Sequence, residues 1–317
     1  MSQKISFVIP CYKSESTIET VIAEIRDEAA KLQGYDYEIV AVDDNSPDHV
    51  YEVLRRLASN DSRIKVLRFA RNFGQHAGML AGMRFAKGDF IVFLDDDGQC
   101  PMDRLGDLLA PLSEGADVAI ARYGKKKQSF FKNLCSRGNE FAAELLVGKP
   151  KELQLGNFMA ISKVIAIEMC RYTGPYPYIS GLFLRASDKI VNVSMPERER
   201  MSGVSTYTFR KLFSLWLNSF TAFSIKPLQW VSILGAMIAF GGAGYGIFIV
   251  LQRLMNPGIA IGWSSIMAAL LLLGGMILFV LGVIGEYLGR MYLTISQTPQ
   301  YVVREQLNME QGTEKNL

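Results

Sequence analysis

The chain has 317 residues, with 34 Lys and Arg against 31 Asp and Glu, and 49% of its residues are hydrophobic. This hydrophobic content excludes an intrinsically disordered chain, and a formal net charge of +3 is too small to indicate a nucleic-acid-binding protein. Two uncharged stretches, between Lys226 and Arg253 and between Arg253 and Glu286, each exceed the roughly 20 residues that span a bilayer. The sequence therefore excludes a wholly soluble protein and predicts two transmembrane helices.

The four cysteines and two histidines form no metal-binding or disulfide pattern. The cysteines lie far apart and no C-x-x-C pair occurs, which favours reduced thiols over a zinc site or a disulfide framework. The N-terminal apolar run Ile5–Ile9 is ended by Pro10 and is far too short for a signal peptide. We therefore expect the part of the chain before the first span to lie in the cytoplasm.

The N-terminal part alternates short apolar runs with helical periodicity. Ser16 and Glu19 have the spacing of a capping box, and apolar residues recur at helical spacing from Ile18 to Leu32. The pattern predicts strands at 5–9, 38–42, 64–69 and 90–94, with further helices at 50–58 and 78–86. Such alternation is typical of an α/β fold with a mostly parallel sheet covered on both faces, in which ligands bind at the carboxyl ends of the strands.

Carboxylates gather where these strands end. Asp43 and Asp44 follow the second strand, the run Asp95-Asp96-Asp97 follows the fourth, and Glu15 lies in the loop after the first. Helix N-capping is the alternative explanation for Asp43 and Asp44, but a cap uses only one residue of a three-aspartate run. Crowded carboxylates repel one another unless a cation or ligand donors offset their charge. The pattern indicates a divalent cation bound together with a phosphate-bearing substrate.

Two segments before the first span each have two possible interpretations. A basic run around Phe130 is either a solvated loop or a contact for an acceptor or lipid headgroup. Its candidate acceptor-binding residues are Lys125, Lys126, Lys127 and Arg137. An apolar stripe from Phe209 to Phe223, with Arg210 as a further acceptor-binding candidate, is either a core helix or an interfacial helix. Because the stripe directly precedes a membrane span, we favour the interfacial helix.

Charges around the two spans predict their orientation. The spans cover residues 228–251 and 261–285, and the segment between them carries only Arg253. Basic residues flank the outer ends of the two spans, at Arg210, Lys211, Lys226, Arg290 and Arg304. The positive-inside rule therefore places both termini in the cytoplasm. Glycines in both spans suit close helix contacts, either within one chain or in a homo-oligomer.

Several short motifs follow one another in a fixed order along the chain. They are FVIPCY at 7–12, EIVAVDDNS at 38–46, RNFGQ at 71–75, DDDGQCP at 95–101, RMSGVSTY at 200–207 and EYLGR at 286–290. Together with two C-terminal spans, this set resembles the family 2 glycosyltransferases that transfer a sugar from a nucleotide donor to a membrane polyprenyl phosphate. That group includes dolichol-phosphate mannose synthase and bacterial undecaprenyl-phosphate enzymes, and the resemblance covers nearly the whole chain.

The resemblance implies a GT-A fold and a set of site residues. It implies that Asp95 and Asp97 are catalytic and form the metal-binding D-x-D pair, with Mg²⁺ or Mn²⁺ as cofactor. Aspartates two apart at a strand end can bind one cation that bridges the donor diphosphate, which supports this assignment. The residues implied to bind the donor are Pro10, Tyr12, Glu15, Asp43, Asp44, Gln75, Asp96, Arg200 and Ser205.

The chain departs from the family pattern in two places. Lys13-Ser14-Glu15 stands where the family commonly has an Asn-Glu pair, and the segment with Gln154 and Asn157 has amides where many members have acidic residues, one of them proposed as catalytic base. A polyprenyl phosphate has its second pKa near ~6 and is already largely an anionic nucleophile at neutral pH. Asn157 therefore stays a catalytic candidate without acting as a base, and metal-assisted departure and positioning would carry the rate.

We thus expect an inner-membrane enzyme in which a polyprenyl phosphate attacks the anomeric carbon of a UDP- or GDP-linked sugar in a single inverting displacement. The expected parts are a cytoplasmic GT-A domain at 1–207, an amphipathic helix at 208–226, two transmembrane helices at 227–286 and a cytoplasmic segment at 287–317. A processive polysaccharide synthase is disfavoured, because it usually needs more spans and a Q-x-x-R-W motif that the chain lacks. A catalytically silent membrane scaffold with the same fold is the alternative from another class.

Overall fold

The computed structural model describes residues 3–124, 149–196, 198, 226–255 and 262–309. Within these residues an eight-stranded sheet has the order β7-β5-β6-β4-β1-β2-β3-β8. The strands are β1 (Gln3–Cys11), β2 (Tyr35–Asp43), β3 (Ile64–Phe69), β4 (Phe90–Phe93), β5 (Val118–Tyr123), β6 (Met159–Ser162), β7 (Ile190–Met195) and β8 (Val303–Leu307). The helices are α1 (Ile18–Lys31), α2 (Val50–Asn60), α3 (Gln75–Phe85), η1 (Met102–Arg104), α4 (Leu105–Ser113), α6 (Lys163–Cys170), α7 (Ile179–Ala186), α9 (Lys226–Met255) and α10 (Trp263–Ile295).

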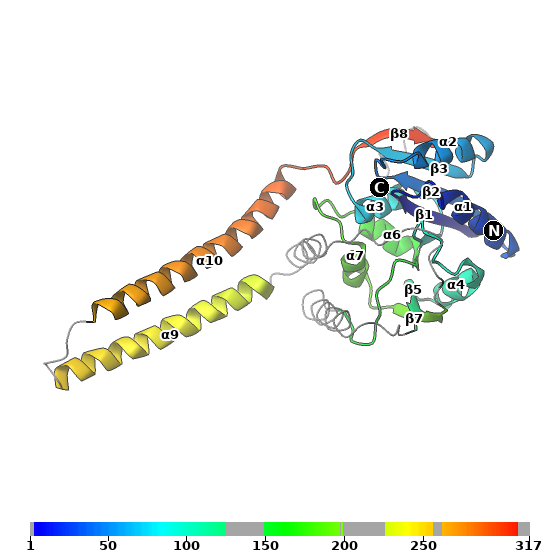
Figure 1. Cartoon of the computed structure of the whole chain (residues 1–317). Coiled ribbons are helices and arrows are strands. Elements are labelled where there is room, and N and C mark those ends of the chain that lie inside the picture. Colours follow the sequence, from blue (N-terminus) through cyan, green and yellow to red (C-terminus); the bar gives the residue numbers. More distant parts are fainter. Residues whose placement is uncertain (1–2, 125–148, 197, 199–225, 256–261, 310–317) are drawn as a thin grey trace.

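The central part of the sheet is parallel, as the sequence predicts. Strands β4, β1, β2 and β3 pair in parallel in that order, while β6 and β8 pair antiparallel with their neighbours. Alternate residues of β2 face opposite sides, so that Ile39 and Ala41 pack with α1, α2 and α4 whereas Val40 and Val42 pack with α3, α6 and α7. The sheet is therefore covered by helices on both faces, which Figure 1 shows from the side.

The start of α1 differs from the predicted capping box. Helix α1 begins at Ile18 with Thr17 as N-cap and without a side-chain cap, so the assignment of Ser16 and Glu19 as a capping box is wrong. The first turn is instead closed by the main chain, because the N–H groups of Thr17 and Ile18 both donate to the carbonyl of Ser14. The Thr17 hydroxyl is thereby left to donate to the carbonyl of Asp96, at 2.6 Å.

Close packing of α3 against β1 fixes the start of α3 at the carboxyl ends of the strands. A Cβ atom on Gly82 would lie 2.4 Å from Cγ1 of Val8, so only glycine allows this approach without a shift of the helix. On Gly78 a Cβ would lie 3.1 Å from Cβ of Pro10. This packing leaves Gln75, the first residue of α3, beside the segment that follows β4.

Helices α9 and α10 run side by side and project from the α/β unit (Figure 1). In the described part of the chain one helical segment, Leu273–Ile295, is long and apolar enough to cross a membrane by length and composition. This segment overlaps the span predicted at 261–285. The span predicted at 228–251, the amphipathic helix and the domain borders expected from the sequence stay predictions.

The chain returns to the sheet after α10. Gln300 donates from Nε2 to the carbonyls of Tyr172 and Gly174, and the ring of Tyr301 stacks on Phe69 with centroids 5.3 Å apart. Strand β8 then pairs antiparallel with β3 and forms one edge of the sheet. No sequence pattern indicated this strand, which makes the C-terminal segment part of the α/β unit.

Candidate active site

The carboxyl ends of β1, β2 and β4 meet at one edge of the sheet, together with the start of α3. Asp44 follows β2, and its carboxylate accepts hydrogen bonds from the main-chain N–H groups of Phe73 at 2.6 Å and Gly74 at 2.8 Å. These two residues precede α3, and the left-handed φ of +92° at Gly74 turns the chain so that both N–H groups face Asp44. Asp44 therefore ties the end of β2 to the beginning of α3.

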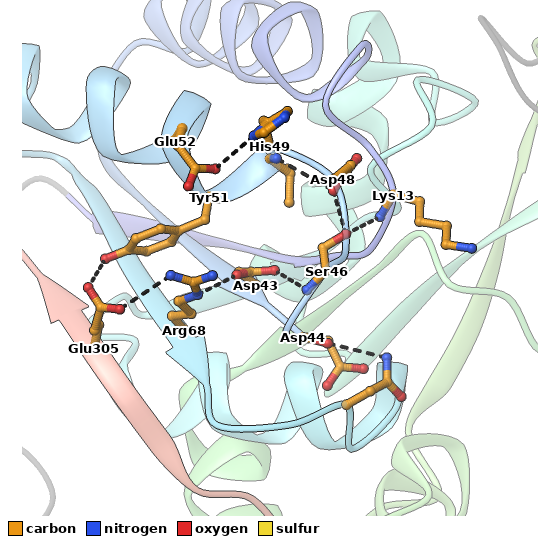
Figure 2. A network of polar contacts seen from close by, with 12 residues as sticks. Lys13, Asp43, Asp44, Ser46, Asp48, His49, Tyr51, Glu52, Arg68 and Glu305 are labelled. Carbon is orange, nitrogen blue, oxygen red and sulfur yellow. Dashed lines mark hydrogen bonds and ion pairs between the residues drawn. The ribbon is translucent and has the colours of Figure 1, made fainter.

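Asp43, the last residue of β2, is fully buried. Its Oδ1 accepts a hydrogen bond from the N–H of Ser46 at 2.8 Å, and its Oδ2 lies 3.3 Å from Nε of Arg68 (Figure 2). Burial raises the pKa of Asp43, although the Ser46 N–H and the charge of Arg68 act in the opposite direction. The carboxylate is thus held by the loop after β2 on one side and by β3 on the other.

Asp95 connects three separate segments of the chain. Its Oδ1 accepts a hydrogen bond from Nε2 of Gln75 at 2.7 Å. Its two oxygens also accept from Nδ2 of Asn157, at 3.2 and 3.0 Å. The two amides come from the start of α3 and from the segment before β6, so the structure brings together three residues that the sequence predicted separately.

Asp96 and Asp97 make different contacts. The Asp96 carboxylate accepts a hydrogen bond from the N–H of Tyr12 at 2.9 Å, which joins the loop after β1 to the loop after β4. Asp97 accepts from the N–H of Gln99 at 3.1 Å, which shapes its own turn. The ring of Tyr12 is 44% exposed and lies next to Lys13, whose ammonium is 5.6 Å from the ring centroid.

The loops after β1 and β2 also bind each other. Glu15 accepts a hydrogen bond from the N–H of His49 at 3.2 Å, and its own N–H donates to Asp48 at 3.0 Å. The hydroxyl of Ser46 accepts from the N–H of Lys13 at 2.8 Å (Figure 2). Of the predicted donor residues, Glu15 thus supports the loop, while Pro10 is buried in β1 and presents no exposed group.

Two carboxyl groups at this edge have strongly raised pKa values. Burial raises the pKa of Asp44 to about 6 and that of Asp96 to about 6, against the lowering effect of the hydrogen bonds that each accepts. Burial disfavours the ionised form, and a cation or additional hydrogen-bond donors would favour it again. The edge is therefore suited to bind a cation or a polar ligand rich in donors.

The carboxylates fit a cation that is shared with a ligand better than one held by protein alone. Among the described residues no group of three or more His, Cys, Asp and Glu side chains is arranged to hold a metal ion. Mg²⁺ commonly takes one or two carboxylates and completes its shell with phosphate oxygens and water. Asp95 and Asp97, oxygen ligands that follow a buried strand, fit such an arrangement.

Other predicted site residues lie outside the described residues. These are Arg200 and Ser205 of the donor set and Lys125, Lys126, Lys127, Arg137 and Arg210 of the acceptor set, and the amphipathic stripe at 209–223 lies there as well. They stay predictions.

Two charged residues next to the site were not identified from the sequence, one that contacts Asp43 and one that acts through the first. Arg68 of β3 pairs with Asp43, and Glu305 of β8 pairs with Arg68 at 3.3 Å. A charged residue near the carboxyl end of a buried strand is a signal that could have identified Arg68. Nothing in the local sequence marks Glu305, because its role depends on a pairing between segments more than 200 residues apart.

In open α/β folds of this kind, ligands bind at the carboxyl ends of the parallel strands, where this chain has its acidic edge. Residues 6–168 match glycosyl transferase family 2, and residues 226–291 match the GtrB C-terminal hairpin. The chain belongs to glycosyl transferase family 2 and is a glycosyltransferase.

Curated relatives align along nearly the whole chain. The uncharacterized glycosyltransferase YkcC of Bacillus subtilis is 31% identical over 96% of this chain and 94% of its own. The bactoprenol glucosyl transferase of Shigella phage SfV is 28% identical over 96% of this chain and 99% of its own.

Solved structures share the fold. Glucosyl-3-phosphoglycerate synthase from Mycobacterium tuberculosis, in complex with Mn²⁺ and uridine-diphosphate-glucose, superposes with a TM-score of 0.50 at 20% identity. The match covers 69% of this chain and 77% of that chain. The predicted GT-A fold with a mostly parallel sheet is confirmed.

Proposed function

We propose that this enzyme transfers a sugar from a nucleotide-sugar donor to a polyprenyl phosphate at the cytoplasmic face of a membrane. One observation carries the proposal. The same chain contains a GT-A sheet with aspartates at the carboxyl ends of its strands and a C-terminal helical hairpin. The relatives that share this full-length arrangement include bactoprenol glucosyl transferases, and bactoprenol is a polyprenyl lipid. A hairpin that holds the enzyme at a membrane suits an acceptor that is anchored in the membrane.

In this proposal Asp95 and Asp97 hold a divalent cation against the donor diphosphate. The cation would neutralise the charge that develops on the leaving nucleoside diphosphate. Gln75 and Asn157 hold the Asp95 carboxylate in place through the hydrogen bonds described above, so that they position a ligand of the cation. Asn157 then contributes orientation, and the acceptor phosphate is the nucleophile without a protein base.

In this proposal the nucleoside binds at the carboxyl ends of β1 and β2. Asp43, Asp44 and the exposed ring of Tyr12 lie at this edge of the sheet. The main-chain contacts of Asp44 and Asp96 fix the loops that would contact the donor. A UDP-linked sugar is the first donor to test, since a solved GT-A neighbour contains uridine-diphosphate-glucose, and a GDP-linked sugar is the second. Arg200 and Ser205 would close on the diphosphate from the segment before the hairpin.

The membrane part of the proposal follows from the hairpin. Helices α9 and α10 would both span the bilayer, with the α/β unit and both termini in the cytoplasm. The proposed parts are the catalytic domain at 1–207, an interfacial helix at 208–226, the two spans at 227–286 and the C-terminal segment. The basic residues at 125–127, Arg137 and Arg210 would attract the acceptor phosphate, and the glycine-rich spans suit a homo-oligomer.

The proposal is tested with purified protein in detergent, undecaprenyl phosphate, Mg²⁺ or Mn²⁺, and a panel of radiolabelled UDP- and GDP-sugars. We expect label in the lipid fraction with one donor, loss of that label with EDTA, and none when the lipid phosphate is omitted. Transfer to a water-soluble acceptor but not to the lipid would contradict the proposed acceptor. Full activity in EDTA would remove the cation from the mechanism.

A further inference from the structure

Strand β8 brings a carboxylate to the donor side of the sheet from the end of the chain. In the register of β8 with β3, Glu305 lies directly opposite Arg68. Its Oε1 lies 3.3 Å from Nη1 of Arg68, and its Oε2 accepts a hydrogen bond from the hydroxyl of Tyr51 at 2.8 Å. Opposite charges at facing positions of an antiparallel pair stabilise that register. Figure 2 shows Glu305 reaching both partners from β8.

Arg68 is held by Tyr51 and Glu305 and reaches Asp43 with its Nε edge. Its guanidinium carbon lies 4.3 Å from the centroid of the Tyr51 ring, so the planar group packs on the ring. Nε then lies 3.3 Å from Oδ2 of the fully buried Asp43. Within the described residues neither of these two atoms has a hydrogen-bond partner, although both are buried. The position of Arg68 therefore depends on Tyr51 and Glu305, and it sets the charge next to Asp43.

The strand that carries Glu305 is anchored at both ends. Before it, Gln300 donates to the carbonyls of Tyr172 and Gly174, and the carbonyl of Val302 accepts from the N–H of Ala70 at 2.9 Å. After it, Asn308 donates from Nδ2 to the carbonyls of Ala58 at 2.7 Å and Ile64 at 2.9 Å. These anchors define where Glu305 lies relative to β3.

We propose that β8 is part of the donor site, with Glu305 as a positioning residue that holds Arg68 against Asp43 and thereby sets the affinity for the nucleotide. The segment that leaves the hairpin thus completes the site for a nucleoside diphosphate. The inference rests on the proposed function, because it takes the loop after β2, which the buried Asp43 holds through the N–H of Ser46, as part of the donor site. It assigns no direct substrate contact to Glu305, which acts through Arg68.

The test compares Glu305→Gln with Gln306→Ala, a matched control on the same strand. Gln306 follows Glu305 and faces Leu67 in the pairing, so its side chain points to the other face of the sheet. A second variant, Tyr51→Phe, removes only the hydroxyl that Glu305 accepts and keeps the ring under Arg68. The full-length protein in detergent is titrated calorimetrically with UDP and with GDP, and donor KM and kcat are measured for transfer to undecaprenyl phosphate.

We expect Glu305→Gln and Tyr51→Phe to raise the Kd of the bound nucleotide and the donor KM by about three- to fivefold, the size expected for a partly exposed ion pair. The kcat should stay within about twofold, and Gln306→Ala should match the wild type.

Unchanged Kd and KM in both variants would overturn the inference and leave β8 as an edge strand only. An equal rise of Kd in Gln306→Ala would also overturn it, because general loosening of β8 would then explain the effect. If Glu305→Gln does not fold, Tyr51→Phe decides. A wild type that binds UDP or GDP but transfers no sugar to the lipid would refute the proposed function alone, because nucleotide binding still tests the role of Glu305.

Discussion

Substitution of Asn157 by aspartate tests whether the enzyme uses a protein base. Asn157 is exposed, and its Nδ2 lies 3.0 and 3.2 Å from the two oxygens of Asp95. Asn157→Asp introduces an acidic side chain into this segment. It also replaces a hydrogen-bond donor with a negative charge next to Asp95. If the acceptor phosphate is already an anion, the new carboxylate has no proton to remove.

The geometry gives the size of the expected change. Two charges 3.0 Å apart repel by roughly 5 kcal/mol at an effective dielectric constant of about 20. Because residue 157 is exposed, solvent screens the repulsion between the new carboxylate and Asp95 to about 1 kcal/mol, the size measured for exposed charge pairs. We expect the displaced Asp95 to lower kcat by about fivefold, with partial recovery as the concentration of divalent cation rises.

The assay is initial-rate transfer to undecaprenyl phosphate at several cation concentrations, with Gln154→Glu as the control. Gln154 lies three residues earlier, and its contacts with Asn192 are made by the main chain, so the same charge is added without loss of a bond to Asp95. A rise in kcat of about 10²- to 10⁴-fold in Asn157→Asp, the size of general-base catalysis, would refute the reasoning.

Four further changes have defined outcomes. Asp97→Asn should abolish transfer, as EDTA does in the wild type, while size-exclusion profiles of the folded protein stay unchanged. Asp44 has a folded-state pKa of about 6 against an ordinary value of 3.8, so ionisation above that pH costs folding free energy. Acidification from about pH 7.5 to about pH 5 should therefore stabilise the wild type relative to Asp44→Asn by about 1.4 kcal/mol, measured as the change in unfolding free energy by chemical denaturation at the two pH values. Glu38→Ala leaves the nearly buried Lys65 ammonium, 2.8 Å from Glu38, without this partner, and should cost about 3 kcal/mol in unfolding experiments. Charge reversal of the lysines at 125–127 to glutamate should raise the KM for the lipid acceptor and leave donor binding unchanged; unchanged acceptor kinetics would favour a solvated loop.

The sequence predicted the parallel centre of the fold because local pattern and tertiary role agree there. The strand predicted at 64–69 is β3, and the helix predicted at 50–58 lies within α2 (Val50–Asn60). Helix α2 buries one face, and β3 buries side chains on both faces of the sheet, so the apolar pattern of each indicates its structure directly. The first turn of α1 differed, because its cap depends on the carbonyl of Ser14 and not on the side-chain spacing of Ser16 and Glu19.

The site was predictable only in part. Motif spacing placed Asp44 and Asp95 at strand ends, and the structure has them there. The partners of each carboxylate depend on distant segments: Gln75 and Asn157 meet at Asp95 only because α3 packs closely on β1 and β6 pairs with β4. No local sequence pattern predicts contacts between residues so far apart in the chain. Strand β8 was not predicted for the same reason, because its place at the edge of the sheet depends on its pairing with the distant strand β3.

The way the chain enters β8 explains how an α/β unit can use a lipid-borne acceptor. Helix α10 ends at Ile295 and β8 begins at Val303, so residues 296–302 make the whole connection. A fully extended chain of that length reaches at most about 25 Å. Val303 pairs with Phe69, the last residue of β3, and the parallel strands β4, β1 and β2 end at that same side of the sheet. The end of α10 must therefore lie close to the aspartate-rich edge. If α10 spans the bilayer as proposed, this short connection holds the edge near the headgroups, within reach of a phosphate that stays anchored in the membrane.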